Sequence, residues 1–311
     1  MGDCIFPLAA PGQCRMGNPL ILTHLNVPKL LREFSLHPDK RLGQNFLSDP
    51  VALQRVAEAA HISAQDTIIE IGAGLGSLTR YLAVLAQKVI AIEIDPKLIP
   101  PLKQVVAPFR NIEIIQGDIL NLQPDELTTS TDYLVVANIP YYITSAIIRH
   151  LLSATTRPKR IVLTIQYELA QRICAGPGNM SLLALSVQVF SKPHIRARIP
   201  AGAFYPAPKV DSAILRLDLF SEPLIPDPIL DIFFNLSQAG FSQKRKMLRN
   251  AMSAGLHLDP KSVEAVLNQA GIDPHRRAET LSIVEWGTLT QYFIDRYPEF
   301  TPGKLPQAAK L

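Results

Sequence analysis

The segment Ile68–Gly76, with the sequence IIEIGAGLG, joins an apolar run to three glycines at alternate positions. Glycines after a strand let the backbone come close to a bound molecule and adopt conformations that other residues avoid. Glu93 ends the next apolar run, 21 residues after Gly72, where a carboxylate can accept hydrogen bonds from the two hydroxyls of a ribose. The two features together predict a site for a nucleoside cofactor.

The spacing of the glycines favours one class of cofactor. A dinucleotide-binding loop has its third glycine at the position that Ser77 occupies here, so NAD is disfavoured. Asp118 follows the third apolar run, and a glycine loop with acidic residues after the second and third strands resembles the class I methyltransferases, which bind S-adenosylmethionine. In that family the aspartate accepts a hydrogen bond from the adenine amino group. The alternative is a structural turn followed by two solvated carboxylates, and the order of all three features disfavours it.

The motif Asn138-Ile139-Pro140-Tyr141 follows the fourth apolar run. Residues that follow strands line the ligand crevice of an open α/β sheet, so Asn138 is expected at the reactive end of the cofactor. An adenine amine is a weak nucleophile because its lone pair is delocalised into the ring, and acceptors that hold its N–H groups favour a more reactive, pyramidal nitrogen.

The Asn138 side-chain oxygen and the carbonyl of Ile139 or Pro140 are candidates for these acceptors. Pro140 stiffens the turn, and Tyr141 would stack on the base. The pattern resembles the motif of methyltransferases that act on amino groups of adenine, cytosine or glutamine. A surface turn with Tyr141 in the core is the alternative.

Four motifs narrow the resemblance to one family. They are Leu42–Asp49 (LGQNFLSD), Ala137–Tyr141 (ANIPY), Phe204–Ala213 (FYPAPKVDSA) and Phe241–Lys246 (FSQKRK). With them, residues 28–297 are similar to the ribosomal RNA adenine dimethyltransferase family. Segments 271–274 and 277–282, together with Trp286, resemble its small-subunit branch, which dimethylates two adjacent adenosines in the 3′-terminal hairpin of 16S ribosomal RNA.

This resemblance implies roles for the matching positions. Asn45 and Leu47 would close over S-adenosylmethionine through backbone or side-chain contacts. Phe204 would hold the target adenine against Tyr141, because two aromatic faces can hold a base without reading sequence. Core packing is the alternative for Phe204, and a plain turn position is the alternative for Asn45. The implied set is Asn138, Pro140, Tyr141 and Phe204 for catalysis and Asn45, Leu47, Gly72, Gly74, Glu93, Asp118 and Asn138 for the cofactor, without a metal.

Basic residues cluster at two places in the sequence. They are Lys244, Arg245, Lys246 and Arg249, expected at the start of a helix, and Arg196 and Arg198, expected on an edge strand. Such clusters can neutralise phosphates and make RNA binding depend on salt. Residues 219–311 hold ten basic and ten acidic side chains, so clustering rather than net charge favours RNA contact. A solvated helix face is the alternative.

The residues of the site need a scaffold, and hydrophobic patterning predicts an α/β fold. Short runs rich in Ile and Val alternate with helix-length segments, which indicates a mainly parallel sheet covered by helices. The expected strands are 67–71, 88–94, 111–115, 133–137 and 160–165. Runs 194–199 and 212–217 can pair antiparallel at the sheet edge. We therefore expect a Rossmann-like class I methyltransferase sheet with a small C-terminal helical domain.

Composition along the chain predicts three regions. Residues 1–23 are rich in Pro, Gly and small residues and are expected to be a disordered leader. Residues 24–219 would form the methyltransferase domain. Prolines after Phe220 mark a boundary, and residues 220–311 would form a small helical domain that contacts RNA. Ser282 and Glu285 have the spacing of a capping box at the start of its last helix.

Length and composition agree with this organisation. The chain has 311 residues, 47% of them hydrophobic and 19% charged, with a formal net charge of +4, which excludes disordered and fibrous protein. Three scattered cysteines exclude a disulfide framework, and no His or Cys spacing resembles a zinc site. The most apolar stretch, 133–152, is interrupted by polar residues, so no membrane span is expected. The first 23 residues lack targeting signals, and we expect a cytoplasmic monomer.

Two other functions stay open at this point. One is dimethylation of a single adenosine in 23S ribosomal RNA, the antibiotic-resistance branch, which shares the glycine loop and the Asn-x-Pro-Tyr motif; the C-terminal resemblance argues against it. The other is a binding or assembly factor of the small subunit in which catalysis is secondary. The presence of Glu93, Asp118, Asn138 and Tyr141 favours an active enzyme. The expected partner is 16S ribosomal RNA within the small subunit or its precursor.

Overall fold

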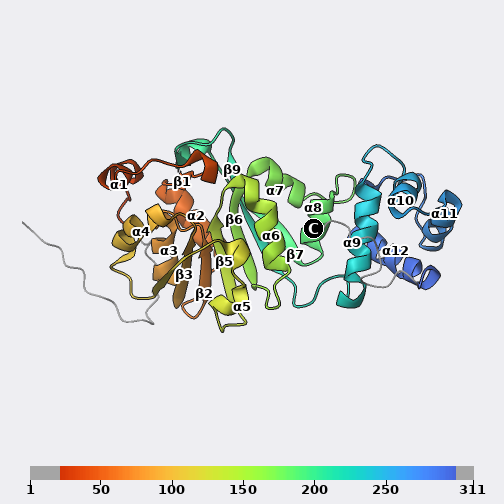
Figure 1. Cartoon of the computed structure of the whole chain (residues 1–311), viewed down its shortest axis with the longest axis horizontal. Helices are drawn as coiled ribbons and strands as arrows, with labels where there is room; N and C mark the ends of the chain where they lie inside the picture. Colours follow the sequence, from red (N-terminus) through yellow and green to blue (C-terminus); the bar gives the residue numbers. More distant parts are fainter. Residues whose placement is uncertain (1–21, 299–311) are drawn as a thin grey trace, which may run out of the picture.

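The computed structural model describes residues 22–298, and a seven-stranded sheet lies at its centre (Figure 1). The strand order is β4-β3-β2-β5-β6-β9-β7; the first five strands are parallel, and β9 is antiparallel to both β6 and β7. The bounds are β2 Thr67–Ile71, β3 Lys88–Glu93, β4 Ile112–Gln116, β5 Tyr133–Asn138, β6 Arg160–Gln166, β7 Ser191–Ile199 and β9 Ser212–Leu219. The expected α/β class is confirmed, and the expected strands end within two residues of the observed ones, except that β7 begins three residues earlier.

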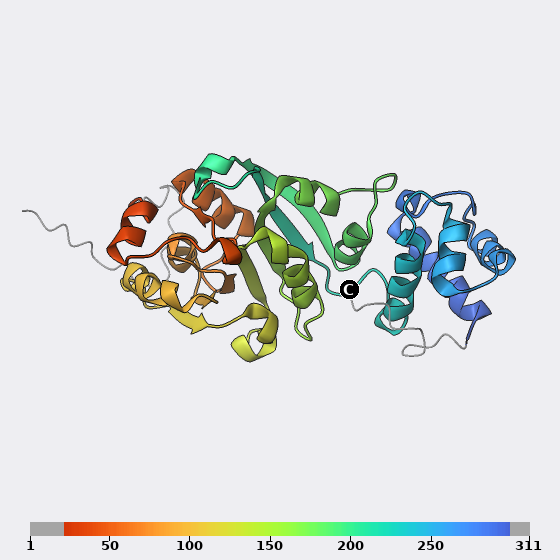
Figure 2. The same cartoon turned by 45° about the horizontal axis from the view of Figure 1, so that its top comes forward.

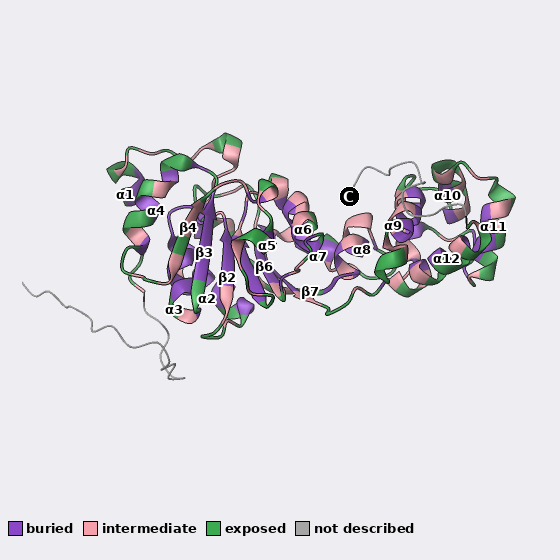
Figure 3. Cartoon of the chain, turned by 60° about the horizontal axis from the view of Figure 1, so that its bottom comes forward, coloured by how far each residue is buried: buried purple, intermediate pink, exposed green. Residues whose placement is uncertain are grey.

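Helices cover both faces of this sheet, which explains why its strands are apolar along their length. Neighbouring residues of a strand point to opposite faces: Ile69 of β2 lies in the core beneath α6–α8, whereas Ile68 lies in the core beneath α2 and α3. Figure 3 shows β2 and β3 buried and outer helix surfaces exposed. The helices are α2 Pro50–Ala60, α3 Ser77–Leu85, α4 Ile99–Val106, α5 Pro124–Leu127, α6 Thr144–Leu152, α7 Tyr167–Ile173 and α8 Leu182–Gln188.

A second, two-stranded sheet joins the start of the chain to the loop before β9. After α1 (Val27–Glu33), strand β1 (Phe46–Leu47) pairs antiparallel with β8 (Phe204–Tyr205). This pairing brings the N-terminal motif 42–49 against the motif 204–213. Except for Leu22 and Thr23, the leader expected over residues 1–23 lies outside the described residues. Leu22 packs on the core beneath α2 and α3, and the Thr23 carbonyl accepts a hydrogen bond from Arg80 at 3.0 Å.

After β9, the described part of the chain holds four α-helices that pack on one another; they are drawn in teal and blue in Figure 2. Trp286, Phe233 and Leu289 are fully buried among them. The capping box expected at Ser282 and Glu285 is confirmed, since both of its reciprocal hydrogen bonds are present. The helices are α9 Asp227–Phe241, α10 Leu248–Leu256, α11 Pro260–Gln269 and α12 Ile283–Arg296.

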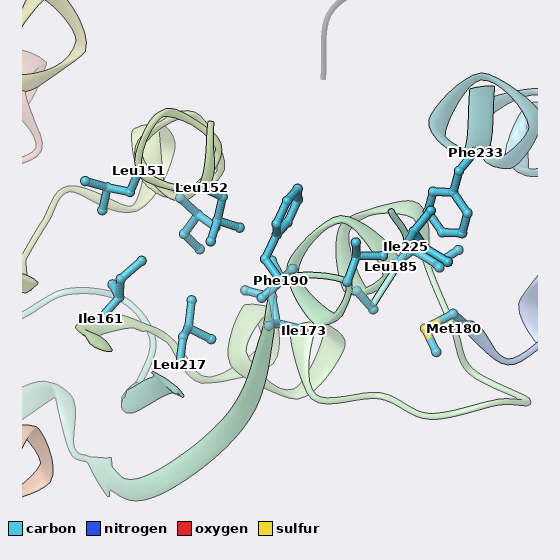
Figure 4. Close-up of a cluster of buried hydrophobic side chains, with 14 of the residues drawn as sticks. Leu151, Leu152, Ile161, Ile173, Met180, Leu185, Phe190, Leu217, Ile225 and Phe233 are labelled. Carbon is cyan, nitrogen blue, oxygen red and sulfur yellow. The ribbon is translucent and has the colours of Figure 1, made fainter. Parts of the chain in front are cut away.

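Apolar side chains connect this helical group to the sheet (Figure 4). The rings of Phe190, after α8, and Phe234, in α9, are stacked with centroids 6.3 Å apart. The carbonyl of Glu279 also accepts hydrogen bonds from the backbone N–H groups of Gly178 and Met180, at 2.9 and 3.2 Å. The shared cluster includes Leu185, Phe190, Ile225 and Phe233.

The apolar stretch 133–152 is divided between β5, a 3₁₀ turn at Tyr141–Ile143 and α6. In the part of the chain that the structure describes, no helix has the length and apolar character needed to cross a membrane.

Two glycines in the helical group give a matched test of its packing. A Cβ on Gly255 in α10 would lie 2.8 Å from the Cα and Cβ of Ala239 in α9, so the helices would have to separate. A Cβ on Gly287 in α12 would meet only the movable Cδ1 of Ile225, at 2.8 Å. Alanine favours a helix over glycine by about 1 kcal/mol. We therefore expect Gly287→Ala to preserve or raise the free energy of unfolding, and Gly255→Ala to lower it by about 1–3 kcal/mol.

Urea denaturation followed by circular dichroism measures both changes. Equal effects of the two substitutions would contradict this account of the packing.

Candidate active site

A cavity opens where the parallel strands β2, β3 and β5 end, the edge at which open α/β sheets bind their ligands. The space between its walls, counted out to the open solvent, is about 590 Å³. Five segments that are far apart in the sequence form its walls. The lining residues are Leu42, Gly43, Gln44, Asn45, Phe46, Gly72, Gly74, Glu93, Ile94, Leu98, Asn138, Ile139, Pro140, Tyr141 and Phe204.

The glycine loop after β2 forms the floor of the cavity. Gly72 and Gly74 have φ angles of 74° and 57°, a left-handed conformation that other residues adopt at a cost. A Cβ would lie 3.3 Å from the Asn138 carbonyl oxygen at Gly72, and 3.2 Å from the Phe46 ring at Gly74. Any side chain here would fill the space between the loop and the opposite wall, so the two glycines keep the cavity open.

Glu93 ends β3 and fixes the shape of the loop. Its Oε2 accepts a hydrogen bond from the Gly74 N–H at 2.7 Å, and its Oε1 accepts one from the Asp95 N–H at 2.8 Å. Burial raises the pKa of Glu93 above its usual range, and the two amide donors act in the opposite direction. Each carboxylate oxygen keeps a second lone pair. Glu93 can therefore accept further hydrogen bonds from hydroxyl groups of a ligand in the cavity.

The side-chain amide of Asn138 is oriented by the N-terminal segment. Its Nδ2 donates to the Asn45 carbonyl at 3.1 Å, which leaves Oδ1 as an acceptor without a donor in the described chain. The Pro140 carbonyl already accepts a hydrogen bond from Ile143 N at 3.3 Å. The carbonyl of Ile139 accepts none from residues 22–298. Of the two carbonyls expected to act beside Asn138, the geometry therefore favours that of Ile139.

Two aromatic rings line the cavity, Tyr141 from the 3₁₀ turn after β5 and Phe204 from β8. The Tyr141 hydroxyl lies 2.6 Å from the hydroxyl of Ser212, the first residue of β9, and this hydrogen bond fixes the ring. Burial raises the pKa of Tyr141. Phe204 lines the cavity and also packs in the core beneath α2 and α3, so the binding and core-packing interpretations both apply to it.

Two expected cofactor residues do not line the cavity. The side chain of Leu47 points into the core, and its neighbour Phe46 faces the cavity instead, because successive side chains of a strand alternate. Asp118 follows β4, and its Oδ1 accepts a hydrogen bond from Leu120 N at 3.0 Å, which caps a short 3₁₀ turn. Phe46 and Gln44 were not singled out from the sequence, although both belong to the motif 42–49.

The basic cluster 244–246 differs from its expected position. Lys244, Arg245 and Lys246 are exposed in the loop between α9 and α10, and α10 begins only at Leu248. The expected helix start is therefore wrong, because residues 242–247 form turns. Arg249 is in α10, but its Nη1 is paired with Glu264 at 2.7 Å.

The two arginines of β7 also differ from each other. Arg198 is paired with Asp211 at 2.7 Å and lies over the Tyr167 ring, with its guanidinium carbon 4.9 Å from the ring centroid. Arg196 is exposed at the irregularity between Ile195 and Ala197. Of these two, Arg196 is the residue without an ion pair inside the described range 22–298. That same range holds no group of three or more His, Cys, Asp or Glu placed to bind a metal ion.

Comparison with known proteins identifies the family. The family model described as ribosomal RNA adenine dimethylase matches residues 36–295. The chain belongs to this family. A ribosomal RNA small subunit methyltransferase A from Dehalococcoides mccartyi is 41% identical over 284 residues, which cover 91% of this chain and 95% of that protein. The protein of the same name from Moorella thermoacetica is 39% identical and covers 84% of this chain and 94% of its own.

Two solved structures of the family's fold are also similar. A dimethyladenosine transferase from Plasmodium falciparum is 30% identical, with a TM-score of 0.71 over 81% of this chain and 98% of that one. The 23S rRNA methyltransferase ErmE is 29% identical, with a TM-score of 0.65 over 80% of this chain and 99% of its own. The expected Rossmann-like methyltransferase fold is thus confirmed.

Glu70 in β2, just before the glycine loop, gives the fold a testable pH dependence. Burial raises the pKa of its carboxyl to about 8; nearby Thr79 acts in the opposite direction, and nearby Glu93 adds to the increase. An exposed glutamate titrates near pH ~4.3. Between about pH 4 and pH 8 the folded protein therefore retains a proton that the unfolded chain has already released. The free energy of unfolding falls as pH rises through this window.

Glu70→Gln keeps the shape of the neutral acid and should remove this slope. We expect the variant to be more stable than the wild type at about pH 8, with a difference that shrinks toward about pH 5. Urea denaturation at several pH values measures the slope, and parallel pH profiles of the two proteins would show that Glu70 is ionised in the fold.

Proposed function

We propose that this protein transfers methyl groups from S-adenosylmethionine to the N6 amino groups of two adjacent adenosines in the 3′-terminal hairpin of 16S ribosomal RNA, during assembly of the small subunit in the cytoplasm. The observation that carries the proposal is the pair of acceptors, Asn138 Oδ1 and Ile139 O, at one cavity with a glycine loop and a buried acid. The relatives named small subunit methyltransferase A support the choice of RNA.

The residues of the cavity fit S-adenosylmethionine. Glycines 72 and 74 leave the space that a Cβ would fill, Glu93 can accept hydrogen bonds from the ribose hydroxyls, and Asn45 with Phe46 closes the opposite wall. Asp118, just beyond β4, is proposed to accept from the adenine amino group. When bound, S-adenosylmethionine supplies an electrophilic methyl group on a sulfonium.

The chain's own task at the target is to hold a nitrogen. Asn138 Oδ1 and Ile139 O would accept the two N–H groups of the adenine amine, which favours a pyramidal nitrogen whose lone pair is available. A base that leaves its stack would lie between Tyr141 and Phe204. The hydrogen bond between the Tyr141 and Ser212 hydroxyls keeps one of these rings in place before RNA arrives. The cationic product loses its proton to water, so no strong base is required.

We further propose that residues 24–219 form the methyltransferase domain and residues 220–311 the RNA-contacting domain. Lys244, Arg245 and Lys246 lie together on an exposed loop and make no ion pair with described residues, so their charges are available to phosphates. Arg196, exposed on β7, is proposed as a second basic contact, on the sheet domain.

The proposal is tested by incubation with labelled S-adenosylmethionine and small subunits that lack the modification, followed by mass mapping of the nucleotides. We expect two adjacent dimethyladenosines near the 3′ end. Asn138→Ala and Tyr141→Ala should both lose at least about a hundredfold in transfer, a typical loss when a positioned group is removed. Tyr141→Ala should do so with unchanged cofactor affinity. Tyr141→Phe keeps the ring and loses only the bond to Ser212, so it should retain most activity.

Transfer to 23S ribosomal RNA in a parallel reaction, with none to small subunits, would overturn the substrate assignment. Near-wild-type transfer by both alanine variants would overturn the proposed acceptor site.

The basic loop gives a separate prediction about RNA binding. Replacing Lys244, Arg245 and Lys246 with alanine should weaken RNA binding and reduce the slope of log affinity against log salt by about 2–3, since each lost phosphate contact contributes up to about 0.9. Cofactor affinity should not change, because the loop does not line the cavity. Lys261→Ala, in α11, is the control for a single exposed charge of the same helical group. Filter binding at several salt concentrations measures the RNA affinity and the salt slope of each variant. An unchanged slope in the triple variant would exclude this loop from the RNA interface.

A further inference from the structure

Gln44 uses both ends of its side-chain amide. Its Nε2 donates to Asp95 Oδ2 at 2.8 Å, and its Oε1 accepts from the backbone N–H of Asp39, also at 2.8 Å. The backbone N–H of Gln44 donates to the Asp39 carbonyl at 3.3 Å. One glutamine therefore closes the turn 39–44 on itself and ties that turn to a residue 51 positions later.

Asp95 connects this contact to the acid of the cofactor site. Its backbone N–H donates to Glu93 Oε1 at 2.8 Å, and its own Oδ1 accepts from Lys97 N at 3.0 Å. Asp95 is only 8% exposed, so its hydrogen bond to Gln44 is largely shielded from water. A charge-assisted hydrogen bond in such a place is stronger than one in solvent.

The residue after Gln44 connects the same turn to the acceptor site. The carbonyl of Asn45 receives the hydrogen bond from Asn138 Nδ2 at 3.1 Å, and the Asn45 side chain donates to the Gly43 carbonyl at 3.1 Å. A continuous series of contacts thus joins the two ends of the cavity. It runs through Glu93, Asp95, Gln44, Asn45 and Asn138.

We propose that Gln44 is a positioning residue whose contact with Asp95 holds the segment 39–45 as a wall of the S-adenosylmethionine site. The inference rests on the proposed function in one respect: the cavity must bind this cofactor. On the C-terminal side of Asn45, the pairing of β1 with β8 holds the chain. On its N-terminal side, the hydrogen bond from Gln44 to Asp95 links the segment to the end of β3. Without that link the turn 39–44 would lose its side-chain contact with the end of β3, and this wall would no longer have a fixed place opposite Glu93.

Exchange of the two partners tests the contact directly. Gln44→Glu faces the Asp95 carboxylate with a second negative charge, and we expect the dissociation constant for S-adenosylmethionine to rise at least about tenfold. Asp95→Asn in the same chain restores complementarity: the new amide can donate to the new carboxylate and still accept from Lys97 N. The double variant should bind the cofactor within about threefold of the wild type.

Titration calorimetry with S-adenosylmethionine alone provides the readout, without RNA. Gln54→Glu is the matched control, because Gln54 makes the same kind of contact, to Glu58 at 2.8 Å, on the exposed face of α2 away from the cavity. Its cofactor affinity should equal that of the wild type. Gln44→Met, which keeps the side-chain length without its polar groups, should weaken binding too and is measured if Gln44→Glu does not fold.

The outcomes separate this inference from the proposed function. Wild-type affinity in Gln44→Glu or Gln44→Met, or a double variant no better than Gln44→Glu, overturns the role of Gln44 while leaving methyl transfer intact. If Gln44→Glu acted only by destabilising the fold, its unfolding temperature would fall, and adding Asp95→Asn would not restore the affinity for S-adenosylmethionine. A wild-type protein that does not bind S-adenosylmethionine overturns the proposed function, and the inference with it.

Discussion

The hydrogen bonds from the Gly74 and Asp95 amides to Glu93 hold the site together. They fix the glycine loop of β2 to the end of β3 through one buried carboxylate, which would be costly to bury without them. A ribose bound in the cavity would meet an acid whose position is already set, so little ordering would remain to be done on binding. The parallel register of β2 with β3 and β5 brings Asn138 to the same edge.

Much of this arrangement could be predicted from the sequence because it follows from local pattern. A strand buried on both faces is apolar at every position, and β2, β3 and β5 end where the Ile and Val runs end. Glu93 and Asn138 could be placed for the same reason, since each directly ends such a run. The capping box at Ser282 and Glu285 is likewise encoded within four residues.

What the sequence did not predict depends on contacts between distant segments. The motif 42–49 has no long hydrophobic run, and only its pairing with β8 decides that Phe46 faces the cavity and Leu47 the core. A slip of one residue in that register would exchange the two. The contact of Gln44 with Asp95 crosses 51 positions and leaves no periodic signal. Similarly, α9 is followed by turns and not by a new helix, because α10 begins only at Leu248, where the chain first packs back against α9.

The shared core between the helical group and the sheet has a consequence for how a long RNA is positioned. A loop that only attracts phosphates contributes affinity but cannot select which adenosine enters the cavity. Two contacts tie the helices on either side of the loop 244–246 to the edge of the sheet. The Phe190 ring stacks on the Phe234 ring, and the Glu279 carbonyl accepts hydrogen bonds from the backbone N–H groups of Gly178 and Met180. The distance from basic loop to acceptor site is then a property of packed side chains rather than of a free linker. An RNA hairpin held at its backbone by that loop would therefore present a limited set of nucleotides to Asn138.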